Sequence, residues 1–459
     1  MNTPKHCFII FSLAFSLLFS LSAFAADDGA AVISQEPAYS LDDCINTALT
    51  DSPAIRAAKE ETKRTSGIIL EAWASIVKLN ATGTYAYFQT PPGITIPAGT
   101  LSPTQPDVFL GSPYHENYTV AVEGSMPVFA GGRVFSGISL AYLQDDVADE
   151  AYRKAIADTV YNVKAAFFGI LLAREVVEIR SDAVALLARH YEATKMKYDV
   201  GLVSKFELTR SGVELANARP PLIEAKKNLR ISTENLKRLL GMSPDAPFEI
   251  EGELAFNEVA VDLDDFLSRA EAESPELIIA RKTERMADRS AGLALGAMFP
   301  TVTAFGKYEW TSNDIYDFDV KEEEWEYTVG AVVTVPISDI ILNATKYKQA
   351  KANYEKAKIL AADTENKVRI EVKEAYFDLV EARELVESQR INTEAAEDSL
   401  RIAEVRYENG ISTLLELLDT QLAVTQARLN YLYSLYNYEE AYSRLLKIVG
   451  ENPYSDKSP

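Results

Sequence analysis

Two acidic side chains near the end of the chain have the types and the spacing that could act on ions. Glu416 and Asp419 lie nine and twelve residues after Tyr407, and residues three apart share one face of a helix. Several such carboxylates around one axis would attract cations and repel one another. Acidic residues near a helix start also favour the helix dipole. From these residues alone, a solvated helix face is therefore the preferred interpretation.

A second acidic cluster lies at residues 311–326. It holds seven carboxylates against the single Lys321, and carboxylate oxygens are ligands that calcium prefers. The spacing fits no recognised calcium-binding loop, so a solvated loop is favoured over a metal site.

Cysteine and histidine are scarce in this chain. Beyond the first 25 residues only one cysteine, Cys44, and two histidines, His115 and His190, remain, which is too few for a Cys/His zinc cluster. There is no nucleophile elbow, glycine-rich phosphate loop or HExxH sequence. The sequence therefore predicts no enzyme, no catalytic residue, no metal and no cofactor.

Charge and the N-terminal segment narrow the class of protein further. Lys and Arg number 46 against 68 Asp and Glu, a net charge of -22, which argues against a nucleic-acid partner because phosphate neutralisation needs excess cations. Residues 1–25 combine Lys5, an apolar run and a small-residue cleavage site at Ala25, which predicts a cleaved signal peptide. The apolar run is shorter than the roughly 20 residues of a membrane-spanning helix. An N-terminal tail at 26–40 follows.

The elements that would position the acidic residues occur twice. Residues 41–59 match 263–281 at an offset of 222, and residues 163–178 match 372–387 at an offset of 209. The thirteen extra residues of the first copy lie between 59 and 118, in a proline-rich stretch typical of a loop. The chain therefore divides into repeat 1 at 41–261, repeat 2 at 262–450 and a C-terminal tail at 451–459.

Proline-free stretches predict very long helices, because proline disrupts a helix interior. Each copy is expected to hold a leading helix, a long helix and a returning helix, and apolar residues at steps of three and four indicate coiled-coil packing. The long and returning helices are predicted at 138–198 with 204–240, and at 339–407 with 412–449. A 69-residue helix spans roughly 100 Å, too long for a compact globular domain. Pro220-Pro221 predicts a kink or break.

Segments with a period of two lie between the leading and the long helices, and they predict one strand hairpin in each copy. The expected strands are 79–88 and 118–128, within a hairpin at about 79–128, and 301–310 and 326–337, within a hairpin at about 301–337. Such strands are typical of transmembrane barrels, although the pattern alone fits a soluble sheet packed on a helix equally well. The signal peptide and the long helices favour the membrane. Since four strands cannot close and open edges are not tolerated in lipid, several chains must pool their strands.

The duplicated plan and two turn motifs, Tyr198-Asp-Val-Gly-Leu-Val-Ser204 and Tyr407-Glu-Asn-Gly-Ile-Ser-Thr413, resemble the TolC family of outer-membrane efflux proteins over essentially the whole mature chain. The resemblance implies a mostly α fold with a small β part. Long coiled-coil hairpins would form an α-barrel tunnel across the periplasm. A homotrimer would pool four strands per chain into a shared 12-stranded barrel in Gram-negative outer-membrane lipid.

The same resemblance implies two sites. The glycine turns would form a tip on which a periplasmic adaptor protein docks, although each glycine also fits a plain helix end. The tip residues are Val200, Gly201, Leu202, Val203, Ser204, Gly410, Ile411 and Thr413. Glu416, Asp419 and Glu207 would line a periplasmic aperture. The first copy matches the acidic pair with Glu207 and Arg210, so only the second hairpin is fully acidic. Ser412 stands where an arginine would hold the aperture closed.

The expected function is a passive exit duct of a tripartite efflux or type I secretion system. An adaptor and an inner-membrane transporter of the RND, ABC or MFS class would open it, and the transporter would choose the cargo. The alternative is a periplasmic coiled-coil adaptor without a pore of its own, which shares the long hairpins but has no need of duplicated strand hairpins.

Overall fold

The computed structural model describes residues 38–451 apart from 90–92, 112–114 and 313–324. The predicted signal peptide at 1–25, most of the tails predicted at 26–40 and 451–459, and most of the acidic loop at 311–326 lie outside the described residues. What is described is mainly helical with a small antiparallel sheet, so the predicted fold class is confirmed.

Each copy begins with two helices where the sequence predicts one leading helix. The pairs are α1 (Leu41–Asp51) with α2 (Pro53–Ala74), and α5 (Leu263–Glu273) with α6 (Pro275–Gly296). Ser52 and Ser274 separate them with extended ψ angles of 127° and 118°. Each serine precedes a proline, which disfavours the helical conformation of the residue before it and starts a new helix well.

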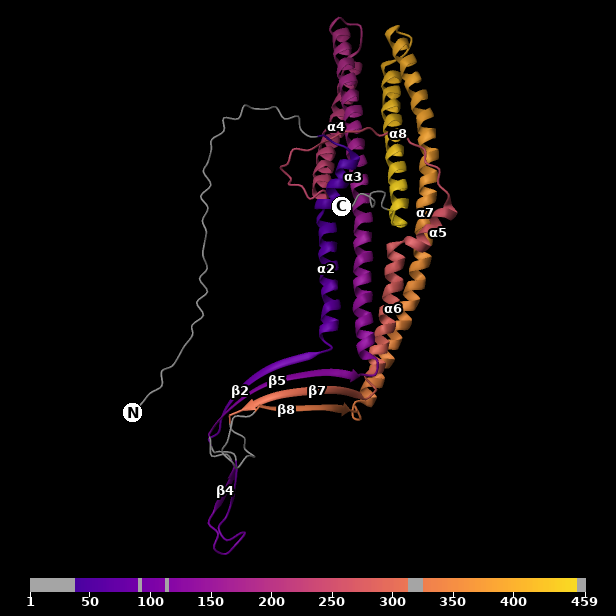
Figure 1. Ribbon diagram of the computed structural model, residues 1–459. Helices are drawn as coiled ribbons and strands as arrows, with labels where there is room; N and C mark the ends of the chain where they lie inside the picture. Colours follow the sequence, from indigo (N-terminus) through magenta and orange to yellow (C-terminus); the bar gives the residue numbers. More distant parts are fainter. Residues whose placement is uncertain (1–37, 90–92, 112–114, 313–324, 452–459) are drawn as a thin grey trace, which may run out of the picture. The chain divides into compact units, whose positions relative to one another are not determined.

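Two long helical hairpins follow, one in each copy. The first consists of α3 (Arg133–Asp199) and α4 (Lys205–Leu239), and the second of α7 (Ile340–Glu408) and α8 (Leu414–Ile448). Figure 1 shows the two helices of each hairpin side by side. The long helix α3 begins five residues before the predicted start at 138. With 67 and 69 residues, α3 and α7 each extend roughly 100 Å at 1.5 Å per residue.

Of the kink or break expected at Pro220-Pro221, the break is wrong, because α4 is one helix that contains both prolines; a kink within α4 stays a prediction. Each proline removes a helical hydrogen bond, at a cost of about 3 kcal/mol in a helix interior. Packing on both sides of the prolines offsets this cost. Ser211 before them and Ala225 and Leu236 after them are buried, and α4 packs along α3.

The strand hairpins of the two copies join into one four-stranded antiparallel sheet. Its order is β2 (Lys78–Tyr87), β5 (Glu116–Phe129), β7 (Thr301–Thr311) and β8 (Trp325–Thr334). The central pair, β5 and β7, comes from different copies and places Val120 opposite Trp310. Within the described part of the chain, β2 and β8 have no further strand beside them. The sheet of a single chain therefore has two open edges.

Four short strands were not predicted. The proline-rich loop holds a second hairpin, β3 (Gly93–Ile96) with β4 (Val108–Gly111), and β1 (Ala38–Tyr39) pairs with β6 (Glu249–Ile250) in parallel. The turn of the β3–β4 hairpin is held by the backbone N–H of Ala98, which donates to Asp107 Oδ1 at 2.6 Å. The extra length of the first copy is thus structured rather than a plain connecting loop.

Each copy is built around its own hydrophobic core, and the two cores use equivalent positions of the repeat. The equivalent buried pairs are Cys44 and Phe266, Ala48 and Ala270, Val163 and Val372, Leu236 and Leu445, and Leu240 and Val449. Burial raises the pKa of the Cys44 thiol to about 12, which keeps it protonated and poorly nucleophilic. Cys44 therefore serves as a small apolar core residue.

Two glycines allow the backbones to meet where the sheet passes into the helices. Gly131 has φ of +60°, and a Cβ there would lie 2.5 Å from the carbonyl oxygen of Gly296. Gly132 has φ of +82° but open space around it. We expect Gly131→Ala to lower the thermal midpoint of the purified protein, measured by circular dichroism, much more than Gly132→Ala does. The Gly132→Ala variant has only the backbone strain, which costs about 1–2 kcal/mol. Equal losses would contradict the close approach.

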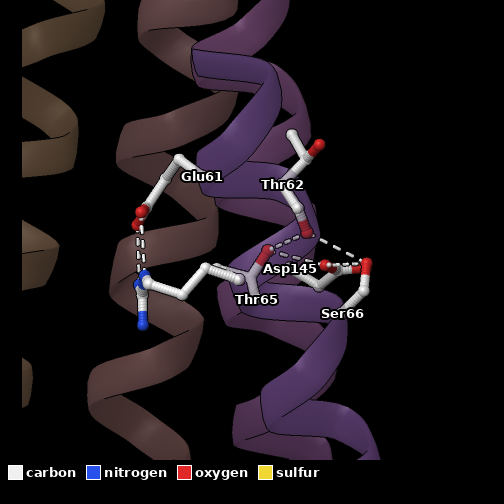
Figure 2. Close-up of polar contacts among 6 residues, drawn as sticks. Glu61, Thr62, Thr65, Ser66 and Asp145 are labelled. Atoms are coloured by element: carbon white, nitrogen blue, oxygen red, sulfur yellow. Dashed lines mark hydrogen bonds and ion pairs between the residues drawn. The ribbon is translucent and has the colours of Figure 1, made fainter. Parts of the chain in front are cut away.

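A polar contact fixes α2 against α3 (Figure 2). The Thr65 side chain is 1% exposed, and its hydroxyl lies 2.7 Å from Asp145 Oδ1, with the Ser66 hydroxyl 3.2 Å from the same oxygen. Thr65→Val should cost about 1–3 kcal/mol, because it removes a donor from a half-buried carboxylate. We expect Thr65→Val to lower the thermal midpoint more than Ser66→Ala does, because the Ser66 hydroxyl is exposed and more distant from Asp145. A midpoint equal to that of the wild type would show that the contact contributes nothing.

Candidate functional site

The two interhelical turns share one geometry. Gly201 and Gly410 have φ of +76° and +70°, the left-handed region that favours glycine at a helix end. The N–H of Leu202 donates to the carbonyl of Lys197 at 2.8 Å, and the N–H of Ile411 donates to that of Arg406 at 2.8 Å. Both turns therefore close the preceding helix with the same hydrogen bond.

The returning helices also start alike. Ser204 Oγ accepts from the N–H of Glu207 at 3.3 Å, and Thr413 Oγ1 accepts from the N–H of Glu416 at 3.3 Å. A hydroxyl in this position caps a helix, and an acidic residue in the first turn favours its dipole. The predicted tip residues Ser204 and Thr413 thus have a structural role in α4 and α8.

The turns expose apolar side chains to solvent. Val200, Leu202 and Ile411 are 71%, 75% and 69% exposed, and Val203 is half-buried. A Cβ added to Gly201 or Gly410 would contact nothing within 4 Å, so only the backbone conformation requires glycine there. Large exposed apolar groups on a rigid turn are suited to a protein contact.

The predicted aperture residues differ in their surroundings. Glu416 Oε1 lies 3.1 Å from a guanidinium nitrogen of Arg406, in an ion pair between the end of α7 and the start of α8. Asp419 is exposed and Glu207 is half-buried, and neither has an ion-pair partner among the described residues. Sequence reasoning missed Arg406. Its position directly before Tyr407 could have indicated that it lies near Glu416, because the turn folds the end of α7 back onto the start of α8.

Side chains also link the first hairpin to the second near the turns. Lys197 Nζ lies 4.8 Å from the centre of the Tyr407 ring, an attractive cation–π distance. Nearer the middle of the helices, His190 Nε2 and Gln421 Nε2 lie 2.8 Å apart. Burial lowers the pKa of His190 from 6.5, so the imidazole is neutral at pH 7 and one of its nitrogens accepts. These contacts were not predicted from the sequence.

A cavity of about 610 Å³ lies between the two hairpins, lined by α3, α4, α7 and α8. Of the predicted aperture residues only Asp419 lines it, and Arg210 lines it from the first hairpin. Gln421, which is 7% exposed, also lines the cavity, and its Oε1 has no hydrogen-bond partner. Ser412 Oγ is buried without a partner as well.

The residues at the turns can attract and position ions through their charges. Over the described parts of the chain, no group of three or more His, Cys, Asp or Glu side chains comes together to hold a metal ion. The chemistry available at the turns is charge, supplied by Glu207, Glu416, Asp419 and Arg406, together with apolar contact at the tip.

The match to a known protein family covers both copies of the repeat. The family described as "Outer membrane efflux protein" matches residues 44–242 and 266–451. The chain is 23% identical over 311 residues to "Outer membrane protein TolC" of Vibrio cholerae, covering 66% of this chain and 70% of that one. It is 23% identical over 336 residues to "Cobalt-zinc-cadmium resistance protein CzcC" of Cupriavidus metallidurans, covering 72% and 77%.

A solved structure shares the fold. The CmeC outer membrane channel of Campylobacter jejuni superimposes with a TM-score of 0.78 at 17% identity, over 95% of this chain and 94% of that one. The likeness extends over helices and sheet together rather than over one hairpin.

Proposed function

Since the chain belongs to the outer membrane efflux protein family, which matches both of its copies, we propose that it is the exit duct of a tripartite efflux or type I secretion system. The family is one of outer membrane channels rather than enzymes, so the protein is an outer membrane protein. The duct would be a passive conduit from the periplasm to the exterior, with the energy supplied elsewhere.

The observation that carries the proposal is the open sheet β2-β5-β7-β8. Lipid offers no hydrogen-bond partner to an unpaired strand edge, so a sheet in the bilayer must close. Four strands are too few, since even small barrels need about eight. Three chains with four strands each would close twelve strands, with β8 of one chain beside β2 of the next. The exposed Tyr327 and Val329 on β8 would then face lipid or the neighbouring chain.

The exposed apolar side chains of the turns support an adaptor as a partner. A periplasmic adaptor would dock on the exposed apolar groups of the tip, and an inner-membrane transporter of the RND, ABC or MFS class would deliver the cargo. The relative CzcC is named for cobalt, zinc and cadmium resistance, but the acidic lining of a passive duct does not assign a cargo by itself. Opening would separate the two hairpins at the cavity between them.

The test is crosslinking in living cells with a tagged chain, followed by detergent extraction and mass spectrometry. We expect a trimer in the outer-membrane fraction, recovered with one adaptor and one class of transporter. Recovery of a soluble periplasmic monomer with no adaptor would favour the alternative, a periplasmic coiled-coil adaptor without a pore.

A further inference from the structure

Arg210 and Asp419 are the same position in the two copies of the repeat. Arg210 lies twelve residues after Tyr198 and Asp419 twelve residues after Tyr407, at the offset of 209 that relates the helical hairpins. The structure brings both to the cavity of about 610 Å³ between the hairpins, Arg210 from α4 and Asp419 from α8. The position therefore carries opposite charges on the two walls of one cavity.

Arg210 keeps one buried N–H without a partner, whereas Asp419 is exposed to solvent without an ion pair among the described residues. Arg210 Nε is buried without a hydrogen-bond partner, and a buried guanidinium N–H without an acceptor is costly. Among the described residues, no carboxylate lies within ion-pair distance of Arg210, and no cation lies within that distance of Asp419. Glu416 differs, because it is paired with Arg406 at 3.1 Å.

Other charges line the same cavity and must be weighed against this pair. They are Arg180, Asp182, Arg189, Glu214 and Arg428. Arg428 is already paired with Glu397 at 2.7 Å. Glu214 lies one turn beyond Arg210 on the same helix, so it shares the cavity without belonging to the repeated position. Neutralising Glu214 is therefore the matched control, because it removes a charge from the same cavity but not from the repeated position.

We propose that Arg210 sets the charge selectivity of the duct entrance by offsetting Asp419, an inference that rests on the proposed function. In a trimer, the layer nine residues after each turn tyrosine would hold six glutamates, Glu207 and Glu416 of each chain, against the three Arg406 guanidinium groups paired with Glu416, so this layer stays negative. The layer twelve residues after it would alternate three arginines with three aspartates. The entrance is then cation-attracting in the first layer and balanced in the second, rather than acidic in both.

The experiment measures the potassium-to-chloride permeability ratio of the purified protein in planar bilayers, from the reversal potential in a salt gradient. Arg210→Gln should raise the ratio about twofold or more, because it uncovers the field of Asp419. Asp419→Asn should lower it, and the double variant should return close to the wild type. Arg210→Lys, which keeps the charge, should leave the ratio unchanged, and Glu214→Gln should move it less than Asp419→Asn does.

The outcomes separate the inference about Arg210 from the proposed function. If Arg210→Gln channels conduct with the potassium-to-chloride permeability ratio of the wild type, the inference is overturned and the proposed function stands. If Arg210→Gln does not assemble, the exposed Asp419→Asn decides, because an unchanged ratio in that variant overturns the inference as well. A wild-type protein that inserts but never conducts would instead contradict the proposed function.

Discussion

Replacing Leu202 and Ile411 together by glutamate is expected to abolish export while trimers still reach the outer membrane. Both side chains are exposed, on turns whose backbone is fixed by Gly201 and Gly410. The substitutions therefore leave packing within the chain intact and place charge on the surface proposed to receive the adaptor. Apolar groups at the centre of an interface commonly carry about 2 kcal/mol or more each, so adaptor binding should fall by at least about tenfold.

The matched control keeps the apolar character of the same two positions. Leu202→Met with Ile411→Val should export like the wild type. Adaptor recovered with the tagged chain after mild crosslinking is the direct readout, and export from cells is the second. Undiminished adaptor recovery with the glutamate variant would remove the docking role from the turns and leave their glycines with a helix-end role only.

The second large effect is expected at the acidic aperture. Replacing Glu416 and Asp419 together by alanine should reduce the cation preference of the open channel and weaken its block by multivalent cations. Two acidic groups per chain are lost, and Arg406 loses its partner at 3.1 Å, so the local field shifts further toward anions. Current through single channels, with and without multivalent cations on the periplasmic side, measures both properties.

Arg406→Gln is the opposing variant. It removes a partly exposed ion pair, which contributes at most about 1 kcal/mol to stability, while it frees the charge of Glu416. We expect a stronger cation preference with no change in trimer yield. If the alanine pair leaves both selectivity and multivalent block unchanged, these carboxylates do not line the conducting path.

Helices and repeat could be predicted from sequence because their signals are long and redundant. The proline-free stretches and the 209-residue offset predicted hairpins that the structure places at Arg133–Leu239 and Ile340–Ile448, within a few residues at most ends. The split of each leading helix at Ser52 and Ser274 followed from the serine–proline pairs but was not foreseen. Proline disrupts a helix interior, but it is well suited to the first turn of a helix.

Features that depend on tertiary packing were either absent from the sequence predictions or predicted wrongly. The unbroken α4 shows that packing along α3 outweighs the local cost of Pro220-Pro221. The β3–β4 hairpin depends on side-chain to backbone bonds such as that from Ala98 N–H to Asp107, which have no periodic signal. At the site, the ion pair of Arg406 with Glu416, and the shared cavity of Arg210 and Asp419, depend on which helices pack together. A single sequence gives the face of a helix but not its neighbour.

Whether the protein is a channel is decided by the conductance of the native protein, extracted from the outer membrane and added to a planar bilayer. We expect trimers that form stable, passive, cation-preferring channels across the bilayer. Protein that purifies as a soluble monomer and produces no conductance would contradict it, because a chain whose open sheet never closes in lipid cannot be the duct.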